Sequence, residues 1–518
     1  MTIEEQALQM KHEDVVSVLV LNKSLTEKVE NLEKSLNWFK KQIFGQKSEK
    51  REFVSDPNQL HLGEFLNKET EVKESPKQEV GSYARGKALK KPLEGSPEDS
   101  GLRFGTDVPV KEIIVENPEI KDLTPDQYEV VSTKNTYRLA QKPAAYEILK
   151  YVNQTVKIKE DSRILTTPAP KSVIEKSFAD VSFLAGLLID KIQYHLPLYR
   201  QHQRLTNAGI IVSRSTLTNL FHNSVDLLTP IYQAQLKSIL DSKVLSMDET
   251  PMKAGAAKGK MKTSYFWPVF GDQNEICFEW RESREHKHVA DILQGYLGVL
   301  LTDGFPAYER YAANNLGIIS AQCWNHGRRK FVDALEYEKE LAETALDYIG
   351  KLYQNEKYIL ENKLNDKNKL LYRVEHSKPV VDQFFNWLEV TLGEYTLLPN
   401  NTFTQAANYS LSRQEALKVF LQFPDVQIDT NHEEREIRSI AMGRKNWNFC
   451  WTEIGAQYVG IMQSLVRTCI LHQVNPYHYL VDVLQRIDLV KQKDVQLLTP
   501  RLWKTHFGDN PLKSDCSF

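Results

Sequence analysis

The sequence predicts a mixed α/β protein whose core is built on a sheet and is preceded by helical regions. Three observations predict this fold class. Residues 18–43 carry apolar side chains at alternating spacings of three and four, and residues 178–228 have helical periodicity. From Lys243 onward, short β-rich runs alternate with helical segments. We therefore expect a helical start, a helical middle and an α/β core along the chain.

The composition is that of a soluble protein with several domains. Of its 518 residues, 41% are hydrophobic and 26% are charged, and this length predicts roughly three or four domains. The longest apolar runs, such as residues 18–21, are far shorter than the roughly 20 residues needed to span a bilayer. The acidic, polar N-terminus predicts no signal peptide, so we expect no membrane partner.

Cysteine usage narrows the class of protein further, whereas the net charge does not. The five cysteines are widely spaced and include no CxxC pair, which predicts reduced thiols in a cytosolic protein and no structural zinc. The net charge of −2 is not that of a basic nucleic-acid binder, but phosphate contact depends on local Lys and Arg. Charge therefore neither favours nor excludes a DNA partner.

Residues 1–45 predict a coiled-coil oligomerisation helix. Asn22 lies on the expected seam, where a buried amide can fix the register and the oligomeric state. The alternative is an amphipathic helix that packs on its own chain. The narrow seam favours self-association, and its residues are Val18, Asn22, Leu25, Val29, Leu32, Leu36, Phe39 and Ile43.

Residues 46–110 predict a polar linker with two basic clusters, at residues 47–51 and 85–91. These clusters are either solvated or in contact with the DNA backbone. Residues 111–165 alternate polar and apolar side chains and predict a small β-rich module.

Residues 166–240 predict a helical region that contains a helix-turn-helix. Residues 207–209 break the first helix, and Ser213 is a plausible N-cap for the second. In a helix-turn-helix the second helix would present Arg214, Thr216 and Asn219 to DNA. An ordinary helical hairpin has the same helix-breaking and N-capping residues and is the alternative.

Residues 241–450 predict the catalytic domain. A strand that ends at Asp248 precedes two strand-like runs, a helix, a buried strand that ends at Asp303, a short helix and a fifth strand. Three strands, helix, strand, helix, strand is the element order of a ribonuclease-H-like fold. If the first and fourth strands are adjacent, Asp248 and Asp303 lie side by side.

A third carboxylate is expected after a helical insertion at about residues 335–425. The helix that starts near Asn431 carries Glu433 and Glu434, which point about 100° apart. Only one of them can face the two aspartates, and we choose Glu434. Residues 451–518 predict a C-terminal helical region.

Three converging carboxylates are the ligand set of a two-metal phosphoryl-transfer site. Mg²⁺ prefers hard oxygen ligands and keeps coordination positions for water and phosphate. Each acid also has a simpler explanation, such as a turn for Asp248 or Asp303 and a surface position for Glu434. Their combination in this strand order favours a site for Mg²⁺, with Mn²⁺ as the alternative ion.

Two basic segments lie beside these acids. The first follows the fifth strand, and the second follows the helix of Glu434 and could bind phosphates and stack on an unpaired base. Solvated surface is the alternative for both segments, and a packed core histidine is the alternative for His326. Their candidate DNA-binding residues are His326, Arg328, Arg329 and Lys330, then Arg444, Lys445, Asn446 and Trp447.

Seven motifs give the chain a family resemblance. It resembles the bacterial insertion sequence sixty-six family of DDE transposases along nearly its whole length, and the resemblance implies that Asp248, Asp303 and Glu434 bind the metal ions. The motifs, in the family's order, are IFGQKSEKR (43–51), HLPLYRQ (195–201), GIIVSRSTL (209–217), DETP (248–251), TDGFPAY (302–308), CWNHGRRKF (323–331) and DTNHEEREIRSIAMGRKNWNF (429–449).

The resemblance implies a transposase that cleaves and transfers DNA strands of an insertion sequence. Its partners would be the element's ends, target DNA and small accessory proteins encoded beside it, in the bacterial cytoplasm at the nucleoid. The chain departs from the family in having no cysteine before Cys277, which leaves the family's zinc module without ligands, and in having Thr430-Asn431 in place of an asparagine pair. The alternatives are a ribonuclease-H-like nuclease without strand transfer and a catalytically silent, transposase-derived DNA-binding protein.

Overall fold

The computed structural model describes residues 22–23 and 102–516, except 107, 116, 122, 143–144, 258–259 and 395–396. The chain divides into two units, and all elements discussed below belong to the unit of Pro92–Tyr395 and Thr402–Phe518. The expected coiled coil lies outside the described residues apart from Asn22 and Lys23, as does most of the expected linker. No helix in the described part of the chain is long and apolar enough to cross a membrane.

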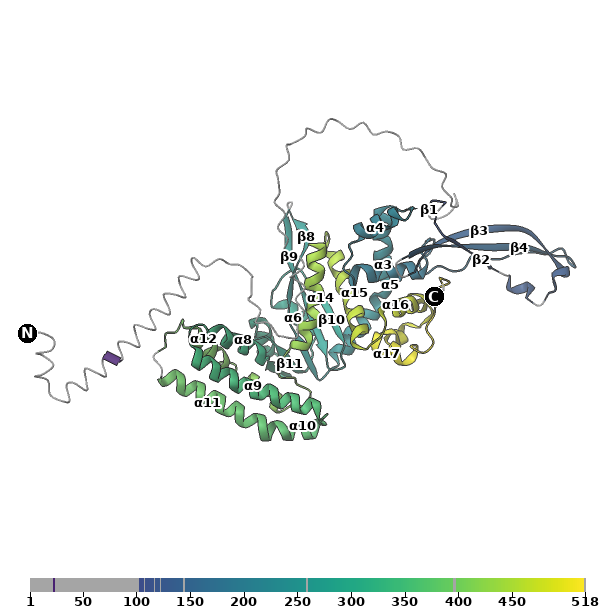
Figure 1. Ribbon diagram of the computed structural model, residues 1–518. Helices are drawn as coiled ribbons and strands as arrows, with labels where there is room; N and C mark the ends of the chain where they lie inside the picture. Colours follow the sequence, from purple (N-terminus) through teal and green to yellow (C-terminus); the bar gives the residue numbers. More distant parts are fainter. Residues whose placement is uncertain are drawn as a thin grey trace, which may run out of the picture. The chain divides into compact units, whose positions relative to one another are not determined.

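The first sheet occupies the stretch for which the sequence predicts a β-rich module. Its strands are β2 (Val110–Val115), β3 (Tyr128–Lys142), β4 (Ala145–Ile158) and β5 (Ile164–Thr166), in the order β2-β4-β3 with β5 on β4. β3 and β4 form the long hairpin at the right of Figure 1. Short helices η1 (Pro118–Ile120) and η2 (Pro125–Gln127) lead into β3.

Three helices follow: α3 (Val181–Ile192), α4 (Leu198–Asn207) and α5 (Arg214–Leu240). Gly209, at φ +77°, turns the chain after α4, and β6 (Ile210–Ile211) pairs with β1 (Arg103–Phe104). The Ser213 hydroxyl accepts a hydrogen bond from Thr216 N at 3.0 Å and caps α5, as the sequence predicts. α5 is 27 residues long, and residues along its length, such as Leu217 and Ile231, are buried in the core.

The central sheet has the strands β7 (Val244–Met247), β8 (Thr250–Ala257), β9 (Lys260–Gly271), β10 (Ile276–Arg281), β11 (Gly298–Thr302) and β12 (Ile318–Gln322). Their order is β10-β9-β7-β11-β12, with β8 on β9. β7, β11 and β12 are parallel, and β9 runs antiparallel to its neighbours. β8 is absent from the strands that the sequence predicts, because Pro251, Gly255 and three alanines give it low β-propensity.

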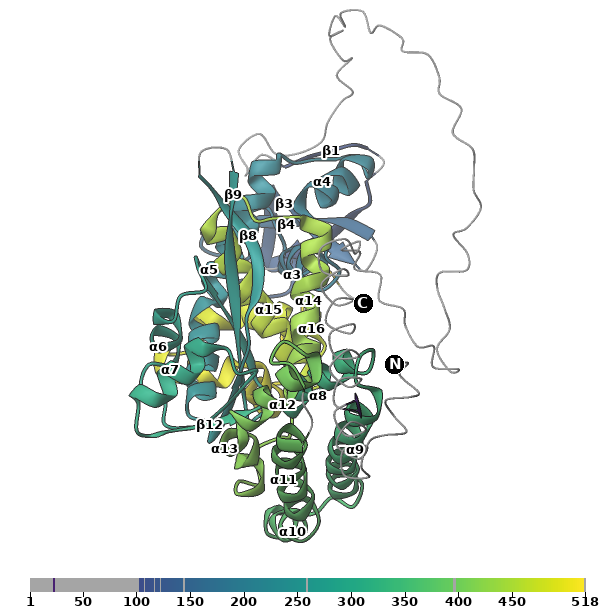
Figure 2. The same cartoon turned by 90° about the vertical axis from the view of Figure 1, so that its left-hand side faces the viewer.

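Both faces of this sheet are buried. On one face Leu245, Trp267 and Cys277 pack with α6 (Lys287–Leu293) and α7 (Pro306–Asn314). On the other face Phe266 and Phe278 pack with α15 (Glu453–Leu471). Figure 2 shows α6 and α7 on one side of the sheet and α14 on the other. Successive residues of a strand point to opposite faces, so each helical layer meets every second side chain.

The helical insertion is packed around Trp324, which contacts the rings of Phe384, Phe385 and Phe420. The Trp324 indole nitrogen donates to the Leu417 carbonyl at 2.9 Å. Figure 1 shows the longer helices of this region gathered in one group. The elements are α8 (Trp324–Ala334), α9 (Lys339–Glu361), α10 (Asp366–Tyr372), the π-helix η3 (Arg373–Ser377), α11 (Lys378–Glu394), α12 (Thr402–Leu411), α13 (Gln414–Lys418) and η4 (Val419–Leu421).

After the insertion the chain returns to the sheet with α14 (Asn431–Trp447) and α15. The remaining elements cover α3 and α5 and complete the larger hydrophobic core. They are α16 (Pro476–Arg486), η5 (Ile487–Leu489), η6 (Gln492–Leu498) and α17 (Pro500–His506).

Candidate metal centre

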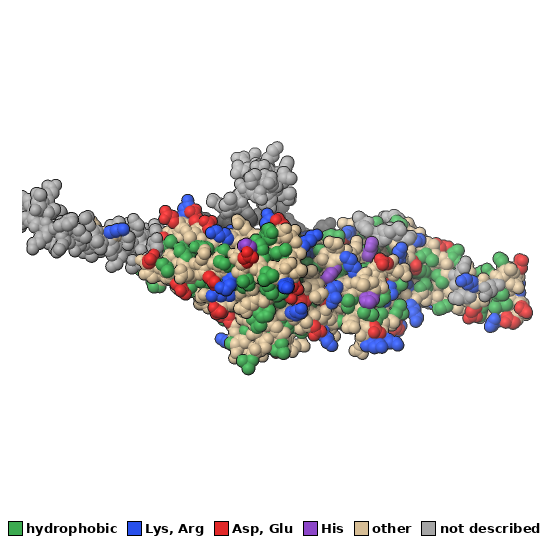
Figure 3. All heavy atoms as spheres, turned by 90° about the horizontal axis from the view of Figure 1, so that it is seen from below, with side chains coloured by type: hydrophobic (Ala, Val, Ile, Leu, Met, Phe, Trp, Pro, Cys, Tyr) green, Lys and Arg blue, Asp and Glu red, His purple; other side chains and the backbone are tan. Residues whose placement is uncertain are grey.

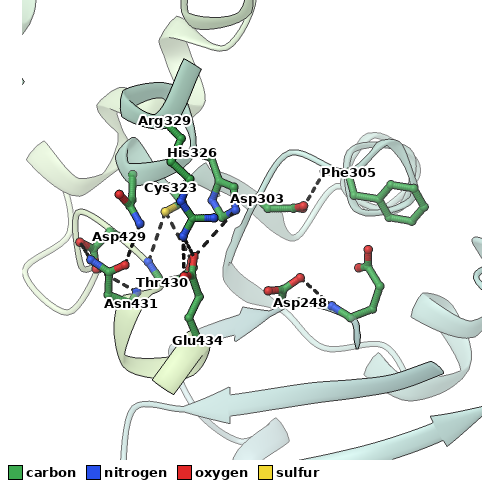
Figure 4. A network of polar contacts seen from close by, with 12 residues as sticks. Asp248, Asp303, Phe305, Cys323, His326, Arg329, Asp429, Thr430, Asn431 and Glu434 are labelled. Atoms are coloured by element: carbon green, nitrogen blue, oxygen red, sulfur yellow. Dashed lines mark hydrogen bonds and ion pairs between the residues drawn. The ribbon is translucent and has the colours of Figure 1, made fainter. Parts of the chain in front are cut away.

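The two aspartates lie at the ends of adjacent parallel strands. Ser246 of β7 is in register with Leu301 of β11, and Asp248 and Asp303 each follow two residues later. Because parallel strands end at the same edge of a sheet, the two side chains are neighbours, as the strand order predicts. Figure 4 shows them side by side.

Asp248, Glu249 and Asp303 form an acidic cluster. One carboxylate oxygen of each residue lies within 4.8 Å of the others. Asp248 Oδ1 accepts a hydrogen bond from Glu249 N at 2.7 Å, and Asp303 Oδ1 accepts one from Phe305 N at 2.8 Å. These backbone donors fix one oxygen of each aspartate and leave the other available to bind a ligand.

Electrostatics at the cluster disfavour ionisation. Burial, followed by the charges of Glu249 and Asp303, raises the pKa of Asp248 to about 7. Burial and Asp303 also raise the pKa of Glu249, although Tyr308 and Arg284 oppose that shift. A divalent cation bound between the carboxylates would relieve their mutual repulsion. Such repulsion is expected of a metal-binding site and not of a turn.

Glu249 is a member of the cluster that the sequence analysis did not select. It lies between β7 and β8, and its Oε2 accepts a hydrogen bond from the Tyr308 hydroxyl at 2.8 Å. Its other oxygen pairs with Arg284, whose guanidinium lies over the Phe305 ring. The adjacent acids in DETP were the available signal, and only Asp248 of this pair was predicted as a ligand.

Glu434 lies beside the cluster, on α14. Arg329 of α8 donates to both of its carboxylate oxygens, at 2.7 and 2.5 Å, and His326 Nε2 lies 3.8 Å from Oε1. Figure 4 shows Arg329 and His326 together above Glu434. The negative charge of Glu434 also contributes to the raised pKa of Asp248, so the two carboxylates are within electrostatic range.

Glu433 is closer to the core than Glu434 and is fully buried. Burial and the charge of Asp248 raise its pKa well above the usual value, and the Ser246 hydroxyl opposes this shift only in part. Burial and the neighbouring carboxylates thus disfavour the charged form of Glu433. Both glutamates are near the aspartates, and they differ in that Glu434 is paired with Arg329.

The N-terminus of α14 is fixed by contacts with β7 and α8. His432 Nε2 lies 3.1 Å from the Ser246 hydroxyl, and Asn325 donates to Asn431 Oδ1 at 2.8 Å. The Thr430 amide and hydroxyl both donate to Cys323 Sγ at 3.4 Å. These contacts hold the glutamates of α14 against the strand ends despite the intervening insertion.

The expected DNA-binding residues of α8 and α5 differ in whether their side chains are exposed. Arg328, Arg329 and Lys330 are exposed, with Lys330 over the Tyr409 ring at 4.6 Å. On α5, Arg214 and Asn219 are exposed. Thr216 instead contacts the Ser213 hydroxyl at 2.8 Å and belongs to the helix cap.

The basic segment after Glu434 is partly engaged within the protein. Trp447 donates its indole N–H to the His195 carbonyl at 3.1 Å, and Lys191 lies over its ring at 5.2 Å. Arg444 donates to the Pro251 carbonyl, whereas Lys445 and Asn446 are exposed. These contacts leave Lys445 and Asn446 as the accessible members of this segment.

The donor set fits a hard divalent cation. All ligand atoms in the cluster are carboxylate oxygens, and neither Cys nor His contributes to it. The fold and the site together define an α/β protein with an acidic cluster at the ends of two parallel strands.

Comparison with family models shows the family to which this chain belongs. Residues 176–458 match the Transposase IS66 family, and residues 464–500 match the IS66 C-terminal element. Residues 31–96 match a model described as Transposase C of IS166 homeodomain. The chain belongs to the IS66 family of transposases, as the motifs predict.

Similar proteins occur in Sinorhizobium fredii (strain NBRC 101917 / NGR234). The uncharacterized protein y4hP is 26% identical over 504 residues, which cover 91% of this chain and 88% of the relative. The uncharacterized protein y4qI is 25% identical over 492 residues, which cover 92% and 89%. The similarity therefore extends over nearly the full length of both relatives.

Proposed function

We propose that the protein is a DDE transposase with a ribonuclease-H-like core, which cuts the ends of an insertion sequence and joins them to target DNA. The observation that carries this proposal is the pair Asp248 and Asp303 at adjacent strand ends, with α14 held beside them. The strand order β10-β9-β7-β11-β12 supports this fold. When β8 is counted together with its hairpin partner β9, β7 is the first strand along the chain and β11 is the fourth. These two strands are neighbours in the sheet.

Asp248, Asp303 and Glu434 would hold two Mg²⁺ ions, or Mn²⁺, and the bound ions would supply Lewis acidity for a water molecule and for the phosphate oxygens. Arg329 orients Glu434 through two hydrogen bonds, and with His326 it can contact a phosphate oxygen. Hydrolysis of one strand yields a 3′-hydroxyl, whose in-line attack on target DNA breaks one phosphodiester bond and forms another. No covalent bond to the protein is required.

The proposed partners are the element's ends and target DNA, contacted by exposed cations such as Arg214, Arg328 and Lys445. Residues 1–45 would join copies of the chain into a homo-oligomer that holds two ends together. Accessory proteins encoded beside the gene and a location at the bacterial nucleoid belong to the same proposal.

The primary test is a strand-transfer assay. Purified protein, Mg²⁺, labelled DNA with the element's own ends and a target plasmid should give joined products, and Asp248→Ala or Asp303→Ala should abolish them. Nicking without joining would favour a nuclease. Binding with neither reaction would favour a silent DNA-binding protein, and cutting by Asp303→Ala would overturn the site assignment.

Glu433→Gln and Glu434→Gln form a matched pair, because each removes one ionisable group from the same turn of α14. We expect Glu434→Gln to lose cleavage by at least about 100-fold, as for other groups that stabilise a transition state. Glu433→Gln should retain most of the activity, since the side chain is fully buried and its surroundings disfavour a negative charge. The reverse result would transfer the role of third ligand to Glu433.

A further inference from the structure

A small pocket lies between the end of α3, α14 and α15, on a different face of α14 from the buried Glu433. Its volume is about 250 Å³. Four of its lining residues on α14 are spaced i, i+3, i+4 and i+7, so they lie on one face of that helix. The pocket is lined by Ile192, Gln193, His195, Arg435, Arg438, Ser439, Met442, Gln463, Val466, Arg467 and Ile470.

The pocket is cationic. Arg435 and Arg438 are exposed, and neither forms an ion pair within the described part of the chain. Arg467 is neutralised by Glu436 at 2.6 Å, and none of the lining residues is acidic. On the face shown in Figure 3, by contrast, Lys and Arg are interspersed with Asp and Glu. Two uncompensated guanidinium groups in one cavity favour an anionic ligand with several oxygen acceptors.

His195 adds a polar group at the base of the pocket. Its backbone is in the left-handed region at φ 55°, and its carbonyl accepts the hydrogen bond from Trp447. Its Nδ1 is buried without a hydrogen-bond partner among the described residues. The backbone of His195 is thus fixed by α14, while one ring nitrogen is left without a partner.

The position of the pocket along α14 relates it to the carboxylates. Arg435 directly follows Glu434, and Arg438 lies four residues beyond Glu434, about 6 Å along the helix axis. A strand whose scissile phosphate is held at the acidic cluster would reach these arginines by running along α14, which would bring another phosphate of the same strand to the pocket.

We propose that Arg435, Arg438 and His195 form a subsite for a DNA backbone phosphate next to the scissile one. This inference rests on the proposed function, because it takes the strand held at Asp248 and Asp303 as its ligand. The subsite would position the strand without reading its sequence, since phosphates carry no base information.

The test is the salt dependence of DNA binding by the full chain in EDTA, where no cleavage occurs. Fluorescent oligonucleotides of arbitrary sequence, single-stranded and duplex, are titrated by anisotropy. The variant Arg435→Gln/Arg438→Gln should bind more weakly, and because the subsite holds one phosphate, the slope of log K against log salt should fall by about 0.7 on single strands and about 0.9 on duplex. The control Lys237→Gln/Arg310→Gln removes the same charge from exposed positions on α5 and α7 and should leave the slope unchanged.

Two negative outcomes are distinguishable. If the wild type binds DNA and the double variant keeps its slope, the subsite is wrong and the proposed function stands. If the wild type binds no DNA at any salt concentration, the proposed function itself fails. Both arginines are exposed and without ion pairs within the described residues, so the variant should unfold at the same temperature as the wild type. Measuring this temperature shows whether a smaller salt slope is due to the missing charges and not to unfolding of the variant.

Discussion

At the scale of single residues, the positions just after β7 and β11 explain which acids come together. Ser246 contacts His432 of α14, and Asp248, two residues later, has the same orientation. Glu249 belongs to the same acidic cluster, and Tyr308 and Arg284 bind its carboxylate. The sequence was sufficient to expect Asp248 beside Asp303. It could not predict the complete burial of Glu433, because that depends on how closely α14 approaches β7.

The raised pKa of Asp248 predicts a pH-dependent stability. Between its unfolded pKa of about 3.9 and its folded value of about 7, the folded state holds a proton that the unfolded state releases. The free energy of unfolding therefore falls as pH rises through this range. Without metal, Asp248→Asn should be more stable than the wild type by about 2–4 kcal/mol at pH 8.

Urea denaturation of both proteins at a series of pH values from 4 to 8 measures this difference, and Asp272→Asn serves as the control at an exposed aspartate. The advantage of Asp248→Asn should shrink towards zero at the acidic end. An advantage independent of pH would contradict the assigned cause, because it would reflect packing rather than ionisation.

At the scale of elements, tertiary contacts account for what local sequence could not predict. β8 forms despite low β-propensity because β9 pairs with it on both sides of a register shift between Ala254 and Ala256. Trp447 belongs to a basic segment, yet the His195 carbonyl and Lys191 hold it against the core. Local signals were sufficient where they were strong, as in the Ser213 cap and the apolar strand that ends before Asp303.

The edge strand β10 is covered by α15 rather than by another strand. Ser464 Oγ accepts a hydrogen bond from Phe278 N at 2.8 Å, and Thr468 Oγ1 accepts one from Ile276 N at 3.2 Å. The two hydroxyls are one helical turn apart and match two outward-facing amides of the strand. A sheet edge is thereby protected from pairing with another chain.

Removing both hydroxyls should be costly. Ser464→Ala/Thr468→Val leaves two buried amides without acceptors, at about 1–3 kcal/mol each, so the free energy of unfolding should fall by about 2–6 kcal/mol in urea denaturation. Thr344→Val on α9, whose hydroxyl bonds only to its own helix, is the control and should change it by less than about 0.5 kcal/mol. Equal effects of the two changes would show that α15 does not cap the edge.

At the scale of the whole molecule, the candidate site combines segments that are far apart in the chain. Asp248 and Asp303 come from one sheet, whereas Glu434 arrives only after the helical insertion. Helical periodicity suggested which face of the helix carries Glu434, but it could not show that this helix packs beside the aspartates. The contacts of Asn325 and Cys323 with the start of α14 supply the physical reason.

A site assembled in this way should couple metal binding to stability. A cation that binds only the folded chain should raise the free energy of unfolding by about 1.4 kcal/mol at ten times its dissociation constant. We expect Mg²⁺ to raise the melting temperature of the wild type in differential scanning fluorimetry. Asp248→Asn/Asp303→Asn should show no such shift, and an equal shift in that variant would place the bound ion elsewhere.

The cover that α15 gives to β10 also has a consequence for synthesis of the protein. Phe278 precedes Ser464 by 186 residues in the chain. It is therefore synthesised about 10–40 s earlier at bacterial elongation rates of about 5–20 residues per second. Throughout that interval the outward amides of β10 have no hydroxyl to bind. Nascent chains on neighbouring ribosomes can then pair edge to edge, so a gene copy interrupted before α15 should yield insoluble protein rather than a soluble competitor of the intact enzyme.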